Sequence, residues 1–262
     1  MPAAHLGDVH IVPAGDAAFL IEWPSRVDPV DIDVNARAIA LADTLRQAAL
    51  PGVCDIVPAF RSVGVFFDPL RSNVDELRAR LRQAAGLDPS IQIPLWPVDQ
   101  ASGKAEWAVA PEDRPIHRVP VCYGGEHGPD LEALAKSAEL GPEDAIAAHA
   151  GRVYRVYMLW FMPGFAYMAD VDARIAWPRR ATPRLKVPAG SVGIAGRQTG
   201  IYPLDSPGGW NIIGRTPVRP FDLRRGATLE AFAFQPGDRV QFYAIDEAEY
   251  ARLAAAARIS SR

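Results

Sequence analysis

The sequence predicts an α+β protein, in which a small N-terminal α/β domain precedes a domain built around a β-barrel. Residues 1–95 alternate strand-like runs with two amphipathic helical patterns. Residues 96–114 are expected to form a linker, because four prolines lie between residues 94 and 115 and no periodicity is sustained there. From residue 115 to residue 262, short apolar runs alternate with glycine and proline turns, as in barrels, before a closing helix.

The N-terminal domain is expected to contain two strand pairs, each followed by a helix. Strands are predicted at 9–12 with 18–23, and at 53–60 with 62–67. Apolar residues recur at helical spacing in both predicted helices: Val34, Ala38, Leu41, Ala42 and Leu45 in the first, and Val74, Leu77, Leu81 and Ala84 in the second. This order favours a small sheet with both helices packed on one face.

The second domain begins with a strand at 116–123 and two helices. Asp130 is expected to cap the first helix, and Pro142 opens the second, which ends before Gly151. A long strand at 153–161 carries aromatic residues on both faces, so both faces are expected to be buried. The remaining strands are short and lie between turns, at 190–195, 200–202, 210–215 and 239–245.

The composition excludes several classes of function. The chain has 262 residues, of which 49% are hydrophobic and 23% charged, with a net charge of −3. Neither a nucleic acid nor a membrane is expected as a partner. The N-terminus lacks the pattern of a secretory signal, and no apolar run is long enough for a membrane span. Cys54 and Cys122 are far apart, so we expect a reduced, cytoplasmic protein.

Motifs for self-contained catalysis are absent from the sequence. The glycines between Gly190 and Gly200 do not have the spacing of a phosphate-binding loop, and no helix is expected behind them. Ser191 is not in a nucleophile elbow, and Cys122 is more typical of a small buried residue than of a nucleophile. The histidines lack metal-ligand spacing, so no metal site is predicted.

Three places remain as candidates for chemistry. His149 is expected at the C-terminal end of a helix, where the helix dipole favours a positively charged imidazole. The sequence is equally compatible with this structural role and with a catalytic one. Arg155 and Tyr157 share one face of the long strand, either as part of the core or as the floor of a cleft that offers a guanidinium to an anion. In the stretch SPGGWNIIGRTP, Gly208 and Gly209 either turn a corner or let the backbone approach a partner or substrate.

Three longer segments, VCYGGEHGPDLEALA, YRVYMLWFMPGFAYM and PRRATPRLKVPAGSVGIAGRQTGIYPLDSPGGWNIIGRTP, resemble the allophanate hydrolase subunit 1 family. That family includes Kip-type inhibitors and the B-type subunits of prokaryotic 5-oxoprolinases, which the chain resembles most. The likeness runs from about Leu6 to Tyr243 and implies that the second domain is a cyclophilin-like β-barrel. His127, Trp160 and the segment 164–168 depart from the residues usual in the family.

The resemblance implies an enzyme subunit that is active only with others. The expected reaction is ATP-dependent opening of 5-oxoproline to glutamate, with ATP used by the complex. The expected partners are an allophanate hydrolase subunit 2-type protein and a third 5-oxoprolinase component. The alternatives are an allophanate hydrolase or urea carboxylase-type carboxyltransferase component, and a binding module that inhibits a histidine kinase. Amidase chemistry would need an activated nucleophile, which the sequence does not offer.

The segments that carry the resemblance also supply a predicted site on one concave face of the barrel. His149 and Arg155 are the expected catalytic residues, for proton transfer and for holding an anionic group. The expected substrate- or partner-binding residues combine aromatic walls with a few polar groups, as binding pockets do: Tyr157, Phe165, Gln198, Thr199, Tyr202, Gly208, Gly209 and Trp210.

Overall fold

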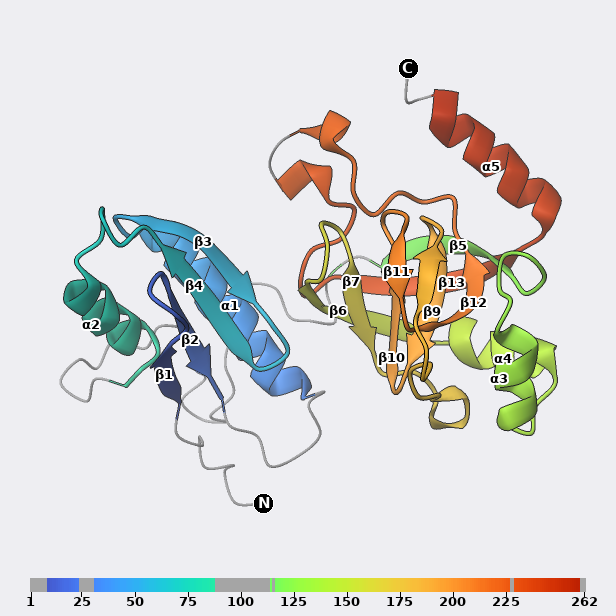
Figure 1. Ribbon diagram of the computed structural model, residues 1–262, viewed down its shortest axis with the longest axis horizontal. Helices are drawn as coiled ribbons and strands as arrows, with labels where there is room; N and C mark the ends of the chain where they lie inside the picture. The colour runs from blue at the N-terminus through green and yellow to red at the C-terminus, as the bar shows by residue number, and fades with distance from the viewer. Residues whose placement is uncertain (1–8, 24–30, 88–113, 115, 227–228, 260–262) are drawn as a thin grey trace. The chain divides into compact units, whose positions relative to one another are not determined.

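A computed structural model describes residues 9–23, 31–87, 114, 116–226 and 229–259 of the chain. The chain divides into two compact units, Met1–Arg114 and Pro115–Arg262, which Figure 1 shows. The predicted linker lies outside the described residues, apart from residue 114. The predicted α+β class is confirmed, since the first unit is a sheet with helices and the second contains a closed barrel.

The first unit is a four-stranded antiparallel sheet with two helices. The strands lie in the order β1-β2-β4-β3. Their bounds are His10–Pro13 for β1, Ala18–Glu22 for β2, Val53–Pro58 for β3 and Ser62–Phe67 for β4, and the helices are α1, Ile32–Ala48, and α2, Val74–Ala84.

Both helices of the first unit cover the same face of this sheet, as the sequence predicts. Leu41 of α1 and Leu81 of α2 are fully buried in one cluster with Ile21 of β2 and Val65 of β4. The Oδ1 atom of Asp31 caps α1 by accepting hydrogen bonds from two backbone N–H groups. The periodicity of the helices and the alternation of the strands therefore meet in a single core.

The second unit is a closed barrel with three helices around it. The strand order is β10-β7-β6-β13-β5-β12-β9, in which only β13 and β5 pair in parallel. The strands are β5, Ile116–Tyr123; β6, Val153–Leu159; β7, Ala166–Ala169; β9, Ser191–Ala195; β10, Gln198–Ile201; β12, Asn211–Arg215; and β13, Arg239–Ile245. The helices are α3, Leu131–Ser137; α4, Pro142–Ala150; and α5, Glu247–Ile259.

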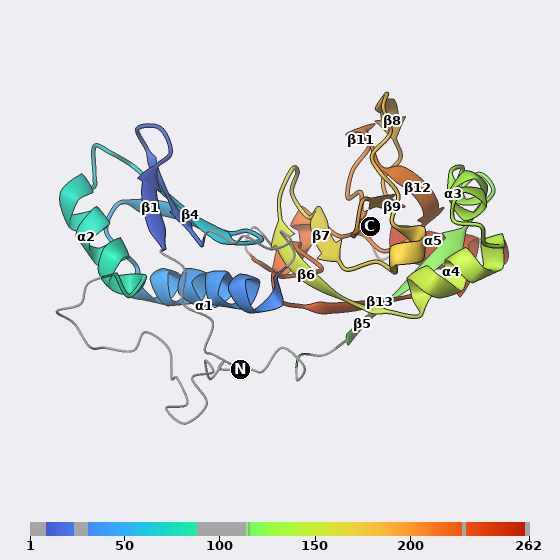
Figure 2. The ribbon, with the colours of Figure 1, turned by 90° about the horizontal axis from the view of Figure 1, so that it is seen from below.

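A short two-stranded ribbon projects from the barrel (Figure 2). It pairs β8, Arg184–Val187, with β11, Ser206–Gly208. Short 3-10 helices occupy other connections: η2, Ala173–Ile175; η3, Leu223–Arg225; and η4, Leu229–Ala231. None of the helices in the described part of the chain is long and apolar enough to cross a membrane.

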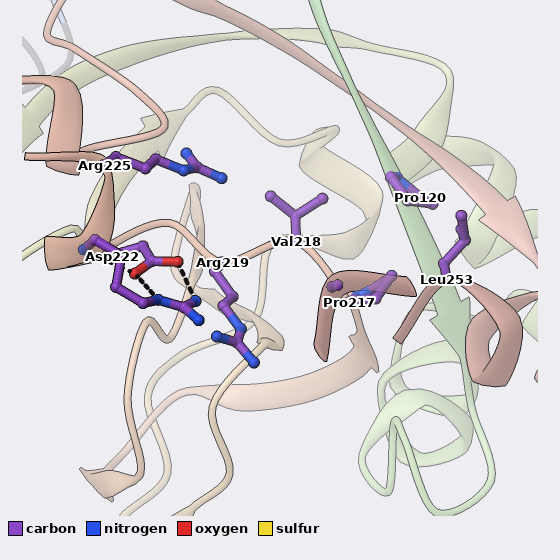
Figure 3. A pocket seen from close by; sticks show the side chains of 9 residues that line it. Pro120, Pro217, Val218, Arg219, Asp222, Arg225 and Leu253 are labelled. Carbon is purple, nitrogen blue, oxygen red and sulfur yellow. Dashed lines mark hydrogen bonds and ion pairs between the residues drawn. The ribbon is translucent and has the colours of Figure 1, made fainter. Parts of the chain in front are cut away.

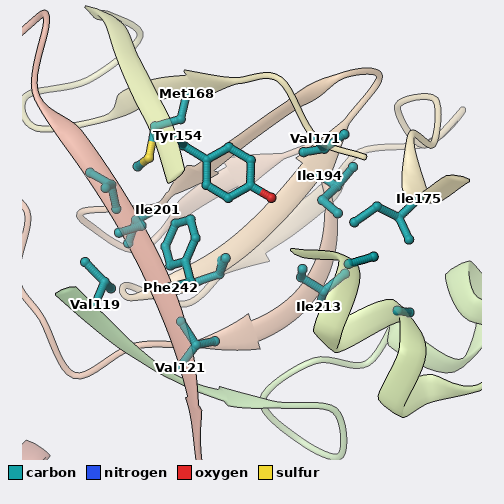
Figure 4. Close-up of a cluster of buried hydrophobic side chains, with 14 of the residues drawn as sticks. Val119, Val121, Tyr154, Met168, Val171, Ile175, Ile194, Ile201, Ile213 and Phe242 are labelled. Atoms are coloured by element: carbon teal, nitrogen blue, oxygen red, sulfur yellow. The ribbon is translucent and has the colours of Figure 1, made fainter. Parts of the chain in front are cut away.

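The barrel is filled by side chains from every wall strand. Val121, Tyr154, Met168, Ile194 and Phe242 are all buried there, and Figure 4 shows these side chains converging between the strands. The barrel interior is thus a packed core rather than an open cavity.

Two local expectations are wrong. The strand predicted at 153–161 ends at Leu159, and Trp160 and Phe161 are 53% and 56% exposed rather than buried. Phe161 has a φ of 73°, and Phe165 N–H donates to the Met162 carbonyl, so the chain turns back there. Asp130 precedes α3 but does not cap it with its side chain, which makes other contacts.

Candidate functional site

A second buried cluster lies on the outer face of the barrel wall. Its members are Phe165, Val187, Ala195, Tyr202, Trp210 and Ile212. On β12, Ile213 belongs to the barrel core, whereas Ile212 belongs to this second cluster. At the end of β10, Ile201 belongs to the barrel core and the next residue, Tyr202, belongs to the second cluster. Successive residues of a strand point to opposite faces, so the cluster packs on the outside of the wall. We call it the aromatic cluster.

Phe165 stands at the centre of the aromatic cluster. Its ring meets those of Tyr202 and Trp210 edge to face, at centroid distances of 5.1 and 5.2 Å. Tyr167 lies 4.8 Å away, and the exposed Phe161 ring is 5.7 Å away. Edge-to-face pairs of this kind are favourable beyond simple burial. Three residues of the predicted site, Phe165, Tyr202 and Trp210, therefore come together.

Two glycines make this packing possible. A Cβ atom on Gly200 would lie 2.9 Å from the Ala166 carbonyl oxygen and 3.1 Å from the Phe165 ring. A Cβ atom on Gly208 would lie only 2.4 Å from the Tyr202 hydroxyl oxygen, whereas one on Gly209 would meet nothing closer than 3.7 Å. The close approach at Gly208 is therefore to Tyr202 of the same chain.

Arg155 on β6 and Gln198 on β10 lie on either side of β7. Ala169 of β7 is the register partner of Arg155 on β6 and also of Gln198 on β10. Directly opposed residues share one face of a sheet, so the three form a row. Because Tyr154 and Val156 on either side of Arg155 belong to the barrel core, the row lies on the outer face. Arg155 and Gln198 are both half-buried.

Tyr157 lies beside this row at an irregularity. The β6–β7 register shifts between Val156 and Met158, which makes Tyr157 the extra residue of a β-bulge. Its side chain is only 1% exposed. Tyr157 is thus a buried part of the wall.

His149 and Thr199 lie inside the barrel, on the opposite face of the wall. Both are fully buried, and the His149 ring stacks on Phe242 at 4.7 Å. The Thr199 hydroxyl donates to the Gly193 carbonyl at 3.1 Å, so it accepts from His149 Nε2–H at 2.9 Å. His149 Nδ1 then accepts from the Tyr123 hydroxyl at 2.8 Å.

This environment favours the neutral form of the imidazole. Burial lowers the pKa of His149 to about 3. The Tyr154 hydroxyl also donates to the His149 carbonyl, so the end of α4 is fixed to β6. The predicted site residues therefore form two groups, with His149 and Thr199 inside the barrel and the aromatic cluster, Arg155 and Gln198 outside it.

Cationic and phenolic groups surround the aromatic cluster. The guanidinium carbon of Arg179 lies 5.9 Å from the centre of the Trp210 ring, a cation–π arrangement. Burial raises the pKa of the Tyr167 hydroxyl, and Arg179 partly opposes that rise. Burial also raises the pKa of Tyr202, although the Trp210 backbone N–H donates to its hydroxyl. Both phenols are neutral hydrogen-bonding groups at neutral pH.

The carboxylate of Asp130, which the sequence predicted only as a helix cap, is buried and binds two arginines and a backbone N–H of β12. Asp130 accepts two hydrogen bonds of 2.8 Å from Arg184 and one of 3.1 Å from Arg180. The Ile212 N–H also donates to it, at 2.6 Å. Its side chain is 8% exposed. No local signal in the sequence reveals this clamp, because Arg180 and Arg184 lie 50 and 54 residues from Asp130.

The described residues contain no group of side chains that could bind a metal ion. Within the described residues, no three His, Cys, Asp or Glu side chains are grouped closely enough to hold an ion.

Comparison with known proteins identifies the family. Residues 9–230 match the family model "Carboxyltransferase domain, subdomain C and D". The chain is 48% identical to the B-type subunit of 5-oxoprolinase from Haemophilus influenzae, an alignment that covers 89% of this chain and 97% of that protein. It is 40% identical to the corresponding 5-oxoprolinase protein of Bacillus subtilis, with 90% of this chain and 92% of that protein covered.

A solved structure agrees with this assignment. The crystal structure of TTHA0988 is 34% identical over 87% of this chain, with a TM-score of 0.69. The present chain spans only 40% of that crystallised chain. The resemblance read from the sequence is confirmed: this chain belongs to the carboxyltransferase domain family of subdomains C and D, together with the B-type subunits of 5-oxoprolinases.

Proposed function

We propose that this chain is a subunit of an ATP-dependent 5-oxoprolinase, which opens 5-oxoproline to glutamate only in the presence of partner subunits. The observation that carries the proposal is the 48% and 40% identity, over nearly the whole chain, to proteins named as B-type subunits of 5-oxoprolinase. ATP is a substrate of the whole complex. Phosphorylation of the lactam oxygen by ATP would activate an amide that is otherwise stable.

The outer row supplies groups that suit 5-oxoproline. The Arg155 guanidinium matches the substrate carboxylate. The Gln198 amide N–H groups are donors for a carbonyl oxygen such as that of the lactam. Three adjacent strands span roughly 10 Å, so two long side chains on the outer strands can reach toward one small molecule above Ala169. In this proposal Arg155 and Gln198 bind and orient the substrate.

His149 and Thr199 have a different role in this proposal. Their hydrogen bond joins α4 to β10 from inside the barrel, one residue from Gln198. His149 is a positioning residue here, because both ring nitrogens are already hydrogen-bonded within the core. Proton transfer by this imidazole is not part of the proposal.

The partner subunit is expected on the outer surface near the aromatic cluster. Leu185 of β8 is 93% exposed and Leu204, before β11, is 46% exposed. Trp160 and Phe161, at the β6–β7 turn, are each more than half exposed, and Phe161 contacts Phe165. Large apolar side chains of this kind mark protein interfaces. We therefore propose that the ribbon and this turn contact the second subunit of the complex.

The compartment is proposed to be the cytoplasm. Cys54 and Cys122 are both free thiols, one exposed and one buried. Unpaired cysteines are usual where thiols are kept reduced.

Reconstitution tests the proposed function. The purified chain, mixed with an allophanate hydrolase subunit 2-type protein and the third component, is expected to release glutamate from 5-oxoproline with ATP consumption. The chain alone is expected to release none. Turnover by the single chain, or a fully assembled complex with no 5-oxoproline-dependent ATP hydrolysis, contradicts the proposal.

The family description supports a second candidate, a carboxyltransferase component. The same reconstituted complex distinguishes the two. ATP-dependent transfer of a carboxyl group to urea, without glutamate release from 5-oxoproline, would establish the second candidate instead.

A further inference from the structure

A pocket at a different place on the barrel has no role in the proposed function. It has a volume of about 390 Å³, within the range of small-molecule sites, which is roughly 300–1,000 Å³. Its lining residues come from β5, the connection after β12, η3 and α5: Pro120, Pro217, Val218, Arg219, Asp222, Arg224, Arg225, Leu253 and Ala257. Pro120 follows Val119 of the barrel core, so the pocket lies outside the wall, beside β5.

The pocket has a charged side and an apolar side. Figure 3 shows Arg219, Asp222 and Arg225 on one side, and Pro120 and Leu253 on the other. A ligand that fills it must therefore combine an anionic group with a carbon skeleton.

The positive charge on the charged side is only partly neutralised. Asp222 pairs with Arg224 through two parallel hydrogen bonds, one of them 2.7 Å long. The bonds from Arg224 hold the pKa of Asp222 at about 2, with a smaller contribution from the charge of Arg219, so this carboxylate stays ionised and offsets one of the three guanidinium charges. Within the described part of the chain, the side chains of Arg219 and Arg225 have no hydrogen bond or ion pair. Two guanidinium charges remain for a ligand.

The segment that carries these arginines is held in place by the fold. Thr216 N–H donates to the Gly190 carbonyl, and the Thr216 hydroxyl accepts from Val218 N–H. Farther along, Asp222 N–H donates to the Ala231 carbonyl at 2.8 Å. The Phe221 and Phe232 rings pack at 5.1 Å. Binding therefore needs little ordering of the backbone, which favours affinity.

We propose that this pocket binds the phosphate dianion of a small organic phosphate. Guanidinium groups match phosphate oxygens in geometry, and a phosphate monoester carries close to two negative charges at neutral pH. Arg219 and Arg225 hold the phosphate, and the side formed by Pro120, Pro217 and Leu253 covers the carbon skeleton. The inference does not rest on the proposed function, because the pocket shares no residue with the outer row or the aromatic cluster.

Phenyl phosphate is the probe, since it joins a phosphate dianion to an apolar ring. Isothermal titration calorimetry with the full chain at pH 7.5 is expected to show binding that weakens as salt is raised. Arg219→Gln and Arg225→Gln are each expected to weaken binding about 10-fold or more. Arg224→Gln is expected to weaken it too, because it leaves the Asp222 carboxylate uncompensated.

Matched controls separate the pocket from general surface charge. Arg82→Gln removes an exposed arginine from α2 in the first unit and is expected to leave the affinity unchanged. Leu253→Ala is expected to weaken phenyl phosphate but not inorganic phosphate. Benzoate, which has the ring but a single charge, is expected to bind at least about 10-fold more weakly than phenyl phosphate.

Three results overturn the proposal. They are the absence of phenyl phosphate binding by the wild-type chain, wild-type affinity in both Arg219→Gln and Arg225→Gln, and equal affinity for benzoate. Thermal melting of each variant checks that the exposed substitutions leave the barrel folded.

Discussion

Arg155 on β6 and Gln198 on β10 are both register partners of Ala169 on β7, so a guanidinium and an amide share the outer face of the barrel wall. The sequence separates them by more than forty residues, and only strand pairing makes them neighbours. His149, which the sequence places close to Arg155, lies on the other side of the same wall. The barrel wall therefore separates Arg155 and Gln198 from the His149 imidazole.

The first prediction concerns the outer row. In the assembled complex, Arg155→Met is expected to lower kcat/KM for 5-oxoproline about 10-fold or more, because a charge-assisted contact with the carboxylate is lost. Gln198→Ala is expected to cause a smaller loss, since a neutral hydrogen bond contributes less. Steady-state kinetics and a thermal melt of each variant give the answer. Wild-type kinetics in both variants would show that the substrate binds elsewhere. Arg82→Gln, which removes an exposed arginine from the first unit, is the control and is expected to keep wild-type kinetics.

The second prediction concerns the pH dependence of stability. The pKa of His149 falls from an ordinary value near 6.5 to about 3 in the folded protein. Between these two pKa values the unfolded chain therefore binds more protons than the folded chain. The contribution of the neutral His149 to the free energy of unfolding is fully present above pH 6.5 and is lost progressively as the pH falls toward 3. The contribution of this group is at most about 1.4 kcal/mol per pH unit. Urea unfolding from pH 8 to pH 5 measures it.

His149→Gln provides the comparison for that experiment. The variant lacks the titrating imidazole, so its free energy of unfolding is expected to fall less steeply below pH 6.5 than that of the wild type. All other titrating groups are common to both proteins. Equal slopes would show that His149 is not buried as a neutral group.

The third prediction compares two neighbouring glycines. Gly208→Ala is expected to destabilise the protein by about 1–3 kcal/mol, because the new methyl group would overlap the buried Tyr202 side chain. Gly209→Ala is expected to change stability by about 0.5 kcal/mol or less, since its nearest contact is an ordinary 3.7 Å. Chemical denaturation of the pair distinguishes them. Similar losses in both variants would contradict the close approach at Gly208.

The fourth prediction compares two ion pairs. Asp130→Asn is expected to cost about 3–5 kcal/mol of unfolding free energy, because Arg180 and Arg184 lose their buried carboxylate. Asp43→Asn, which breaks an exposed pair with Arg46, is expected to cost about 1 kcal/mol or less. If Asp130→Asn is as mild as Asp43→Asn, the clamp contributes little to the barrel.

Local sequence patterns determined most of the secondary structure. The strand at 62–67 and the strand at 239–245 have the predicted bounds, because alternation and flanking turns are properties of neighbouring residues. The Asp246 carboxylate accepts from Glu249 N–H, as its position before the closing helix indicates. The three segments that resemble the family, among them residues 178–217, were recognisable from the sequence as well. These features need no knowledge of distant contacts.

Only the tertiary structure decided which side of the wall each site residue faces. Thr199 and Gln198 are adjacent in the sequence, yet one enters the barrel core and the other joins Arg155 outside, because neighbouring strand residues alternate. Barrel closure also decided that His149 is desolvated, because its ring is enclosed by Tyr123, Tyr154, Thr199 and Phe242. These partners lie on strands from distant parts of the chain, so the burial of His149 is set by strand pairing rather than by local sequence.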